Sequence, residues 1–209
     1  MLQSIEAPRY RWRILSEKAR AELLEWRKSR GHPWHSPPHR AGATTVYHLS
    51  TTCYEHAPYI GKSLKRMRDF CEQLLEAITG NTSVLYAWCV LPNHYHLLAR
   101  SADVLLTVKQ LGLLHGRTSY AWNKEDGSVG RQVWFRCLEK NIRGERHRFA
   151  TMNYIHNNPV HHKYVEKWAD WPFGSAIEFL DKMGIKAARE IWTKYPILDF
   201  GKGWDDPRV

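Results

Sequence analysis

Strand-like and helix-like patterns alternate along the middle of this 209-residue chain in an order that few folds share. β-Branched and aromatic residues predict four strands, at residues 44–50, 83–91, 95–100 and 132–138. Apolar residues at spacings of three and four predict helices over residues 62–79 and 105–123. The order strand, helix, strand, strand, helix, strand is that of a ferredoxin-like antiparallel sheet with helices packed on one face, so we predict an α+β fold.

Residues 145–158 predict a third helix, which we expect Pro159 to end. At about 100° per residue, an apolar stripe forms on the side of this helix that we expect to face the sheet. Its members are Phe149, Met152 and Ile155. Tyr154 and Asn158 stand four residues apart, so we expect them to be neighbours on a polar flank.

Changes in composition divide the chain into three parts. We predict a basic, aromatic N-terminal extension over residues 1–42, a main domain over 43–171 and a C-terminal extension over 172–209. The N-terminal extension contains a predicted helix at 11–30, and the C-terminal one a short helix at 175–183. Tryptophans beside cations in the N-terminal extension could stack on unpaired bases or simply pack on the main domain, and both readings stay open. They are Trp12, Trp26 and Trp34.

The formal charge of +10 and a pI near 9.5 favour a polyanionic partner, and nucleic acid in particular. The longest apolar run, residues 84–91, is far shorter than the roughly 18 residues that a membrane span needs, and the N-terminus does not read as a signal peptide. We therefore expect a cytoplasmic protein with no membrane partner. The candidate phosphate contacts are Arg40, Lys109, Arg117, Arg143, Arg146 and Arg148.

Two motifs carry the candidate chemistry, LPNHYHLL at residues 91–98 and YIHNNPV at 154–160. His94 and His96 are two apart on a predicted strand, so both imidazoles point to one face while Tyr95 points to the other. In a chain with 12 histidines such a pair can also arise by chance, as two histidines on a solvent-facing strand. The four cysteines contain no C-x-x-C pair, and we expect them to be reduced and mostly buried.

A tyrosine and an amide on a helix that crosses such a strand suit attack on a phosphodiester. A divalent cation held by the two histidines, with Asn158 as an oxygen ligand, offsets the phosphate charge. The Tyr154 hydroxyl is then the candidate nucleophile. Asn158 can alternatively be an ordinary residue at the helix end, and Tyr154 an ordinary tyrosine packed by its ring.

Both motifs, in this order and about 60 residues apart on a basic chain, closely resemble the REP-associated tyrosine transposases. These belong to the single-tyrosine HUH (His-hydrophobe-His) transposase superfamily, and the resemblance covers residues 43–171. It implies the ferredoxin-like fold, Mg²⁺ or Mn²⁺ bound by His94, His96 and Asn158, and attack by Tyr154 on single-stranded DNA. The expected product is a 5′-phosphotyrosine with a free 3′-hydroxyl on the released strand.

The same resemblance implies hairpin-forming DNA such as REP-like palindromes as the partner, a monomer or homodimer, and association with a bacterial nucleoid when DNA is bound. Two positions depart from the family pattern. Tyr95 is only partly hydrophobic, and His161-His162-Lys163 stands where relatives usually carry a basic residue and a small one before glycine. The alternative function is a non-catalytic DNA- or RNA-binding regulator that retains the fold.

Overall fold

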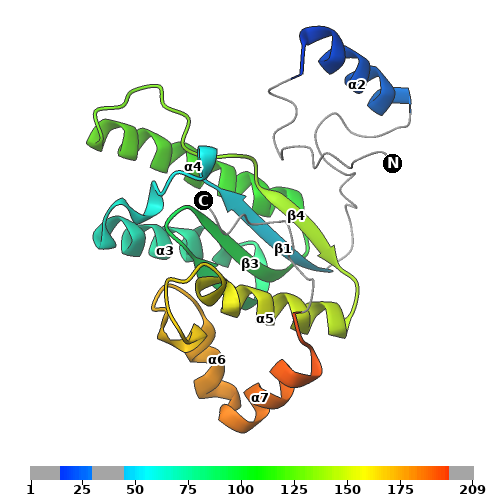
Figure 1. Ribbon diagram of the computed structural model, residues 1–209, viewed down its shortest axis with the longest axis vertical. Coiled ribbons are helices and arrows are strands. Elements are labelled where there is room, and N and C mark those ends of the chain that lie inside the picture. Colours follow the sequence, from blue (N-terminus) through cyan, green and yellow to red (C-terminus); the bar gives the residue numbers. More distant parts are fainter. Residues whose placement is uncertain (1–14, 30–44, 198–209) are drawn as a thin grey trace, which may run out of the picture. The chain divides into compact units, whose positions relative to one another are not determined.

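A four-stranded antiparallel sheet forms the centre of the chain from residue 45 onward (Figure 1). The computed structural model describes residues 15–29 and 45–197. The strands are β1 (Thr45–Thr52), β2 (Thr82–Val90), β3 (His94–Ser101) and β4 (Leu138–Ile142). Their order in the sheet is β2-β3-β1-β4, and every neighbouring pair is antiparallel. This order confirms the predicted ferredoxin-like fold.

The two crossover helices, α3 (Leu64–Thr79) and α4 (Val104–Glu125), pack on one face of the sheet. Each begins at a polar N-cap, where the side chain of Ser63 or Asp103 accepts a hydrogen bond from a backbone N–H in the first turn. Alternate strand residues, among them Leu49 and Leu97, fill the core under these helices.

The opposite face of the sheet is covered by α5 (Glu145–His161), which crosses the strands as Figure 1 shows. Met152 and Ile155 of α5 pack against Leu98 of β3, in agreement with the predicted apolar stripe. Two further helices, α6 (Ala176–Met183) and α7 (Ile185–Lys194), pack against the outer side of α5. Helix α5 therefore lies between the sheet and a second layer of helices.

Three 3₁₀ turns complete the described part of this unit. They are η1 (Tyr54–His56), η2 (Ile60–Lys62) and η3 (Trp168–Asp170). All four cysteines are free thiols; three are buried and Cys137 is half-buried, as expected. None of the helices in the described ranges has the length and apolar character that crossing a membrane requires.

The predicted strand at 132–138 is wrong, because pairing in that region begins only at Leu138. Val133 and Trp134 are buried in the core as an extended segment that touches the sheet through a single bridge between Cys53 and Trp134. The real fourth strand, LEKNI, is an exposed edge strand. Charged residues are typical of sheet edges, where they discourage further pairing, and they hide the alternation that signals a strand.

Helix α5 does not end at Pro159 but continues to His161. Proline lacks the N–H that would bond to Ile155, yet the next turn still forms, since the His162 N–H donates to the Asn158 carbonyl at 3.0 Å. Helix α7 was not predicted from the sequence.

The contact pattern separates residues 1–40 from residues 41–209 as two compact units. In the first, α2 (Glu17–Ser29) lies within the predicted helix at 11–30. Trp12, Trp34 and Arg40 lie outside the described residues, so their roles stay predictions. In the second unit, the segment after residue 171 packs with the sheet domain: the Trp88 N–H donates to Ser175 Oγ at 2.9 Å.

Candidate metal and tyrosine site

His94 and His96 both point from β3 toward α5, because they are alternate residues of one strand. Each side chain is 2% exposed, and their ring centroids are 5.0 Å apart. Tyr95 points to the other face of the sheet, as predicted, and it is fully buried there. The two imidazoles therefore share one small space between the sheet and α5.

Helix α5 brings Tyr154 and Asn158 to these imidazoles. The Oδ1 atom of Asn158 lies 2.9 Å from Nε2 of His94, and the centroid of the Tyr154 ring lies 5.3 Å from that of His96. The four residues come from two segments about 60 residues apart in the sequence. The structure thus brings together the whole candidate set that the two motifs predicted.

The expected polar flank of α5 is buried rather than exposed. Tyr154 is 6% exposed and Asn158 is fully buried, because α5 is covered on both sides. On its outer side Asn153 Nδ2 donates to the Tyr195 carbonyl at 2.8 Å, and His156 Nε2 lies 3.1 Å from Ser175 Oγ. Tyr154 therefore has little contact with solvent.

Asn93 orients the His94 ring from the turn between β2 and β3. The amide nitrogen of Asn93 donates to the His56 carbonyl at 3.1 Å, which turns Oδ1 of Asn93 toward Nδ1 of His94 at 2.7 Å. Because Oδ1 can only accept, Nδ1 of His94 carries the proton, and in the neutral ring Nε2 has the lone pair. This is the tautomer that a metal ion bound through Nε2 requires.

Close packing of the chain fixes the position of that turn. The Gly61 N–H donates to the Pro92 carbonyl at 2.9 Å. A Cβ atom at residue 61 would lie 2.4 Å from Cβ of Pro92, so only glycine allows this approach. The absence of a side chain at Gly61 thus helps to place His94.

The donor atoms of this site fit a divalent cation. Nε2 of His94 and Oδ1 of Asn158 lie within hydrogen-bond distance of each other, and both are atoms of a kind that can bind a divalent cation. Their separation of 2.9 Å would let both atoms reach one ion. The amide nitrogen of Asn158 is buried and makes no hydrogen bond to the described residues.

Two histidines that the motifs did not identify lie beside the set. Nε2 of His48 on β1 is 3.1 Å from Nδ1 of His96, and the His162 ring centroid is 4.9 Å from that of His94. Within the described ranges, no group of three His, Cys, Asp or Glu side chains is placed to hold a metal ion. These rings therefore surround the pair without adding a third imidazole ligand. Finding His48 from sequence would require the register of β1 against β3.

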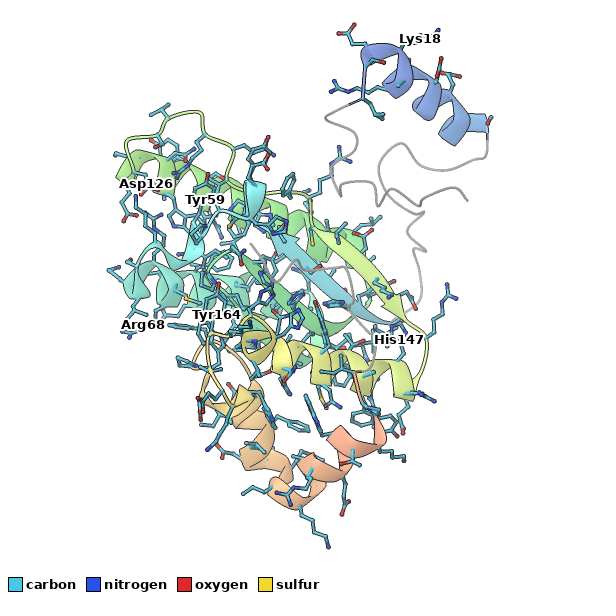
Figure 2. The ribbon with its side chains drawn as sticks, viewed as in Figure 1. Lys18, Tyr59, Arg68, Asp126, His147 and Tyr164 are labelled. Carbon is cyan, nitrogen blue, oxygen red and sulfur yellow. The ribbon has the colours of Figure 1, made fainter. Side chains whose placement is uncertain are left out.

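The predicted basic residues fall in two places. Arg143, just before α5, and Arg146, in its first turn, are exposed. Both shortly precede His147 in the sequence, which Figure 2 labels, and the Arg148 guanidinium lies 5.1 Å from the Tyr86 ring. Burial, together with the nearby charges of Lys140 and Arg143, lowers the pKa of His147.

Lys109 and Arg117 are exposed on α4, which packs on the opposite face of the sheet. They are therefore not brought to the candidate site, and a contact between them and nucleic acid stays a prediction.

A second polar network lies behind the histidine pair. On the α4 face of the sheet, the Tyr95 hydroxyl lies 3.0 Å from Nε2 of His115 and 3.1 Å from Oγ1 of Thr51. Burial raises the pKa of Tyr95 well above its usual value and lowers that of His115 to about 4. These groups satisfy one another's hydrogen bonds on the face of the sheet opposite the histidine pair.

Comparison with known proteins gives a fold-level relationship. No family model matches this chain, and no curated protein matches it significantly. A solved structure described as the REP-associated tyrosine transposase bound to a REP hairpin aligns with 70% of this chain and 86% of its own length. The TM-score is 0.54 and the sequence identity is 18%. At that identity the likeness shows that the two proteins share a fold.

Proposed function

We propose that this chain is a metal-dependent DNA endonuclease and strand transferase that acts on single-stranded, hairpin-forming DNA through Tyr154. The observation that carries the proposal is the convergence of Tyr154 and Asn158 of α5 on the two imidazoles of β3. The shared fold with a tyrosine transposase supports it.

His94, His96 and Asn158 would hold Mg²⁺ or Mn²⁺. When bound, the cation would offset the charge of the scissile phosphate and orient it. Two neutral imidazoles and one amide leave that cation's positive charge undiminished, so the site attracts phosphate rather than repelling it. Imidazole ligands suit later transition metals better than Mg²⁺, and this favours Mn²⁺ of the two ions.

Tyr154 would act as the nucleophile. In the proposed step its phenol oxygen forms a bond to phosphorus and loses its proton, while the bond from phosphorus to the 3′-oxygen breaks. The departing 3′-oxygen takes up a proton, and the phosphate stays on the tyrosine as a 5′-phosphotyrosine. Attack by a 3′-hydroxyl on this ester reverses the step, so strands can be rejoined without ATP.

The substrate is proposed from charge and from the structural neighbour. Positive charge gathers at the start of the helix that carries Tyr154, from Arg146 and Arg148 in its first turns and from Arg143 just before it. The neighbour is described as bound to a REP hairpin, and we propose a hairpin-forming single strand as the substrate here. Because one chain supplies both the tyrosine and the histidines, a monomer would contain a complete site.

A non-catalytic nucleic-acid-binding regulator is the second candidate. The observation in its favour is the 6% exposure of Tyr154, which leaves little room for a phosphate at the hydroxyl. A regulator would use the same basic surface but would form no covalent bond to DNA.

One gel separates the two functions. Labelled hairpin DNA is incubated with the protein and Mn²⁺, and the mixture is then denatured and run beside Tyr154→Phe and the control Tyr164→Phe. We expect a covalent adduct with wild type and Tyr164→Phe, none with Tyr154→Phe, and loss of the adduct when EDTA replaces Mn²⁺. Salt-sensitive binding with no adduct under any of these conditions favours the regulator and rejects the enzyme.

A further inference from the structure

His48 is a buried histidine on β1 that the two motifs do not include. It is 3% exposed and lies on the same face of the sheet as His96, since Ser50, two residues along β1, pairs with His96. Nε2 of His48 is 3.1 Å from Nδ1 of His96, and the two ring centroids are 5.2 Å apart. A buried polar side chain thus contacts one candidate ligand directly.

The two candidate ligands are held in the same way by different elements. Nδ1 of His94 faces Oδ1 of Asn93, and Nδ1 of His96 faces Nε2 of His48. In both rings the Nδ1 atom is occupied by a neighbour inside the protein, so each ring has only Nε2 to offer to a cation. Metal-binding histidines usually use one ring nitrogen for the metal and donate the other N–H to a second group.

We infer that His48 is a positioning residue that accepts a hydrogen bond from Nδ1–H of His96 and so holds His96 in its metal-binding tautomer. Nε2 of His96, which is buried, then carries the lone pair. This inference rests on the proposed function for its metal, although the tautomer itself is a property of the metal-free protein.

His48 also contacts the candidate nucleophile. Its ring meets that of Tyr154 edge-on, at 6.1 Å between centroids, while the Tyr154 ring lies 5.3 Å from that of His96. The three rings form one packed group, so the ring at residue 48 sets the spacing between the ligand and the phenol. An acceptor without a ring at this position should preserve the tautomer but leave the spacing less well fixed.

Two substitutions separate the hydrogen bond from packing. His48→Leu fills much of the volume but accepts no hydrogen bond, whereas His48→Gln can place an oxygen near the position of Nε2. His115→Gln is the matched control, because His115 is also a buried histidine whose Nε2 contacts a residue of β3, but on the other face of the sheet. Thermal melting of each variant shows that it is folded before it is used.

The first measurement is the ¹⁵N NMR spectrum of the histidine rings in metal-free protein. We expect His96 to be protonated at Nδ1 in wild type and in His48→Gln, and to lose this preference in His48→Leu. A wild-type His96 protonated at Nε2, or one that keeps its tautomer in His48→Leu, overturns the inference whatever the metal does.

The second measurement is a Mn²⁺ titration of each protein by calorimetry. We expect His48→Leu to weaken Mn²⁺ binding about 10- to 100-fold, His48→Gln to recover most of the loss, and His115→Gln to bind like wild type. Equal affinity in His48→Leu and wild type overturns the inference. No Mn²⁺ binding by wild type, combined with the expected tautomer, counts instead against the proposed metal function.

Discussion

Backbone strain at single residues is found beside the candidate site. Among the described residues, the non-glycine positions with positive φ are Glu55, His56 and Lys163. The His56 carbonyl accepts the hydrogen bond that orients Asn93, and Lys163 directly follows His162. A left-handed conformation costs an L-residue about 1–2 kcal/mol, so it persists only where the surrounding contacts require it.

Lys163→Gly should stabilise the protein. Lys163 has φ of 61°, which glycine adopts without the steric penalty of a Cβ atom. After subtraction of the greater chain entropy of glycine in the unfolded state, we expect a gain of about 0.5–1 kcal/mol in the free energy of unfolding. Urea denaturation followed by circular dichroism measures the gain.

Lys163→Ala is the control for loss of the charge and of the long side chain. Alanine keeps the backbone strain, so we expect the free energy of unfolding of Lys163→Ala to lie within about 0.5 kcal/mol of the wild-type value. Equal stabilisation by alanine and glycine would show that the lysine side chain, and not φ, is the source of the effect.

At the scale of elements, the sequence predicted the helices and strands whose hydrophobic patterns arise locally. The alternation in β1 and β3 and the spacing in α3 and α4 gave the order of elements, and the patterns of β3 and α5 placed His94, His96, Tyr154 and Asn158. The burial of α5 could not be predicted, because it depends on α6 and α7 covering the outer side of that helix. The contact of His48 with His96 depends on strand register, which no local pattern contains.

A buried ion cluster joins the two helices behind the sheet. The Asp126 carboxylate, 2% exposed at the end of α4, accepts hydrogen bonds from Arg66 of α3 at 2.7 Å and from Arg131 at 2.8 Å, and it pairs with Lys62 at 2.6 Å. Figure 2 shows Asp126 at the far end of α4 from the strands. The hydrogen bond from Arg66, with those from Lys62 and Arg131, holds the pKa of Asp126 well below its usual value.

Asp126→Asn should destabilise the protein by about 2–3 kcal/mol at pH 7, because it removes the buried counter-charge of Arg66 and leaves the more exposed Glu125 carboxylate, at 2.7 Å, to pair with it. Asp69→Asn is the control. It breaks only the exposed pair between Lys65 and Asp69, so we expect a loss below about 1 kcal/mol. Urea denaturation of the three proteins measures both losses.

Acid should narrow the difference in the free energy of unfolding between wild type and Asp126→Asn. A carboxyl whose pKa is lowered by folding contributes stability above its unfolded pKa of about 3.9, and the contribution is lost as the pH falls toward the folded value. We expect the gap to shrink from about pH 5 downward. A gap that stays constant to pH 3 would show that the carboxylate charge does not stabilise the fold.

At the scale of the whole unit, the sheet separates two kinds of surface. The α5 face carries the histidine pair, Tyr154 and the arginines at the start of α5, whereas α3 and α4 cover the other face. The net charge of +10 belongs to the full chain and does not by itself say which face meets a polyanion. Under the proposed function the polyanion would meet the α5 face, because that face carries the candidate nucleophile.

Two double variants with the same loss of charge test that choice. Arg143→Ala with Arg146→Ala removes two exposed cations from the α5 side, and Lys109→Ala with Arg117→Ala removes two from α4. Binding of a labelled hairpin DNA is measured by fluorescence anisotropy from 50 to 300 mM salt. Each lost phosphate contact lowers the slope of log K against log salt by about 0.7 on single strands and 0.9 on duplex.

We therefore expect the α5 variant to bind several-fold more weakly at low salt, with a slope reduced by about 1.4–1.8, and the α4 variant to keep the wild-type slope. Both double variants lose the same charge, so the long-range attraction between protein and DNA falls equally in both. A difference in slope between the two variants therefore comes from direct phosphate contacts. If the slope of log K against log salt falls in the α4 variant instead, DNA lies across α3 and α4, on the far side of the sheet from Tyr154. That result would separate DNA binding from the candidate chemistry and leave the histidine pair without a phosphate to act on.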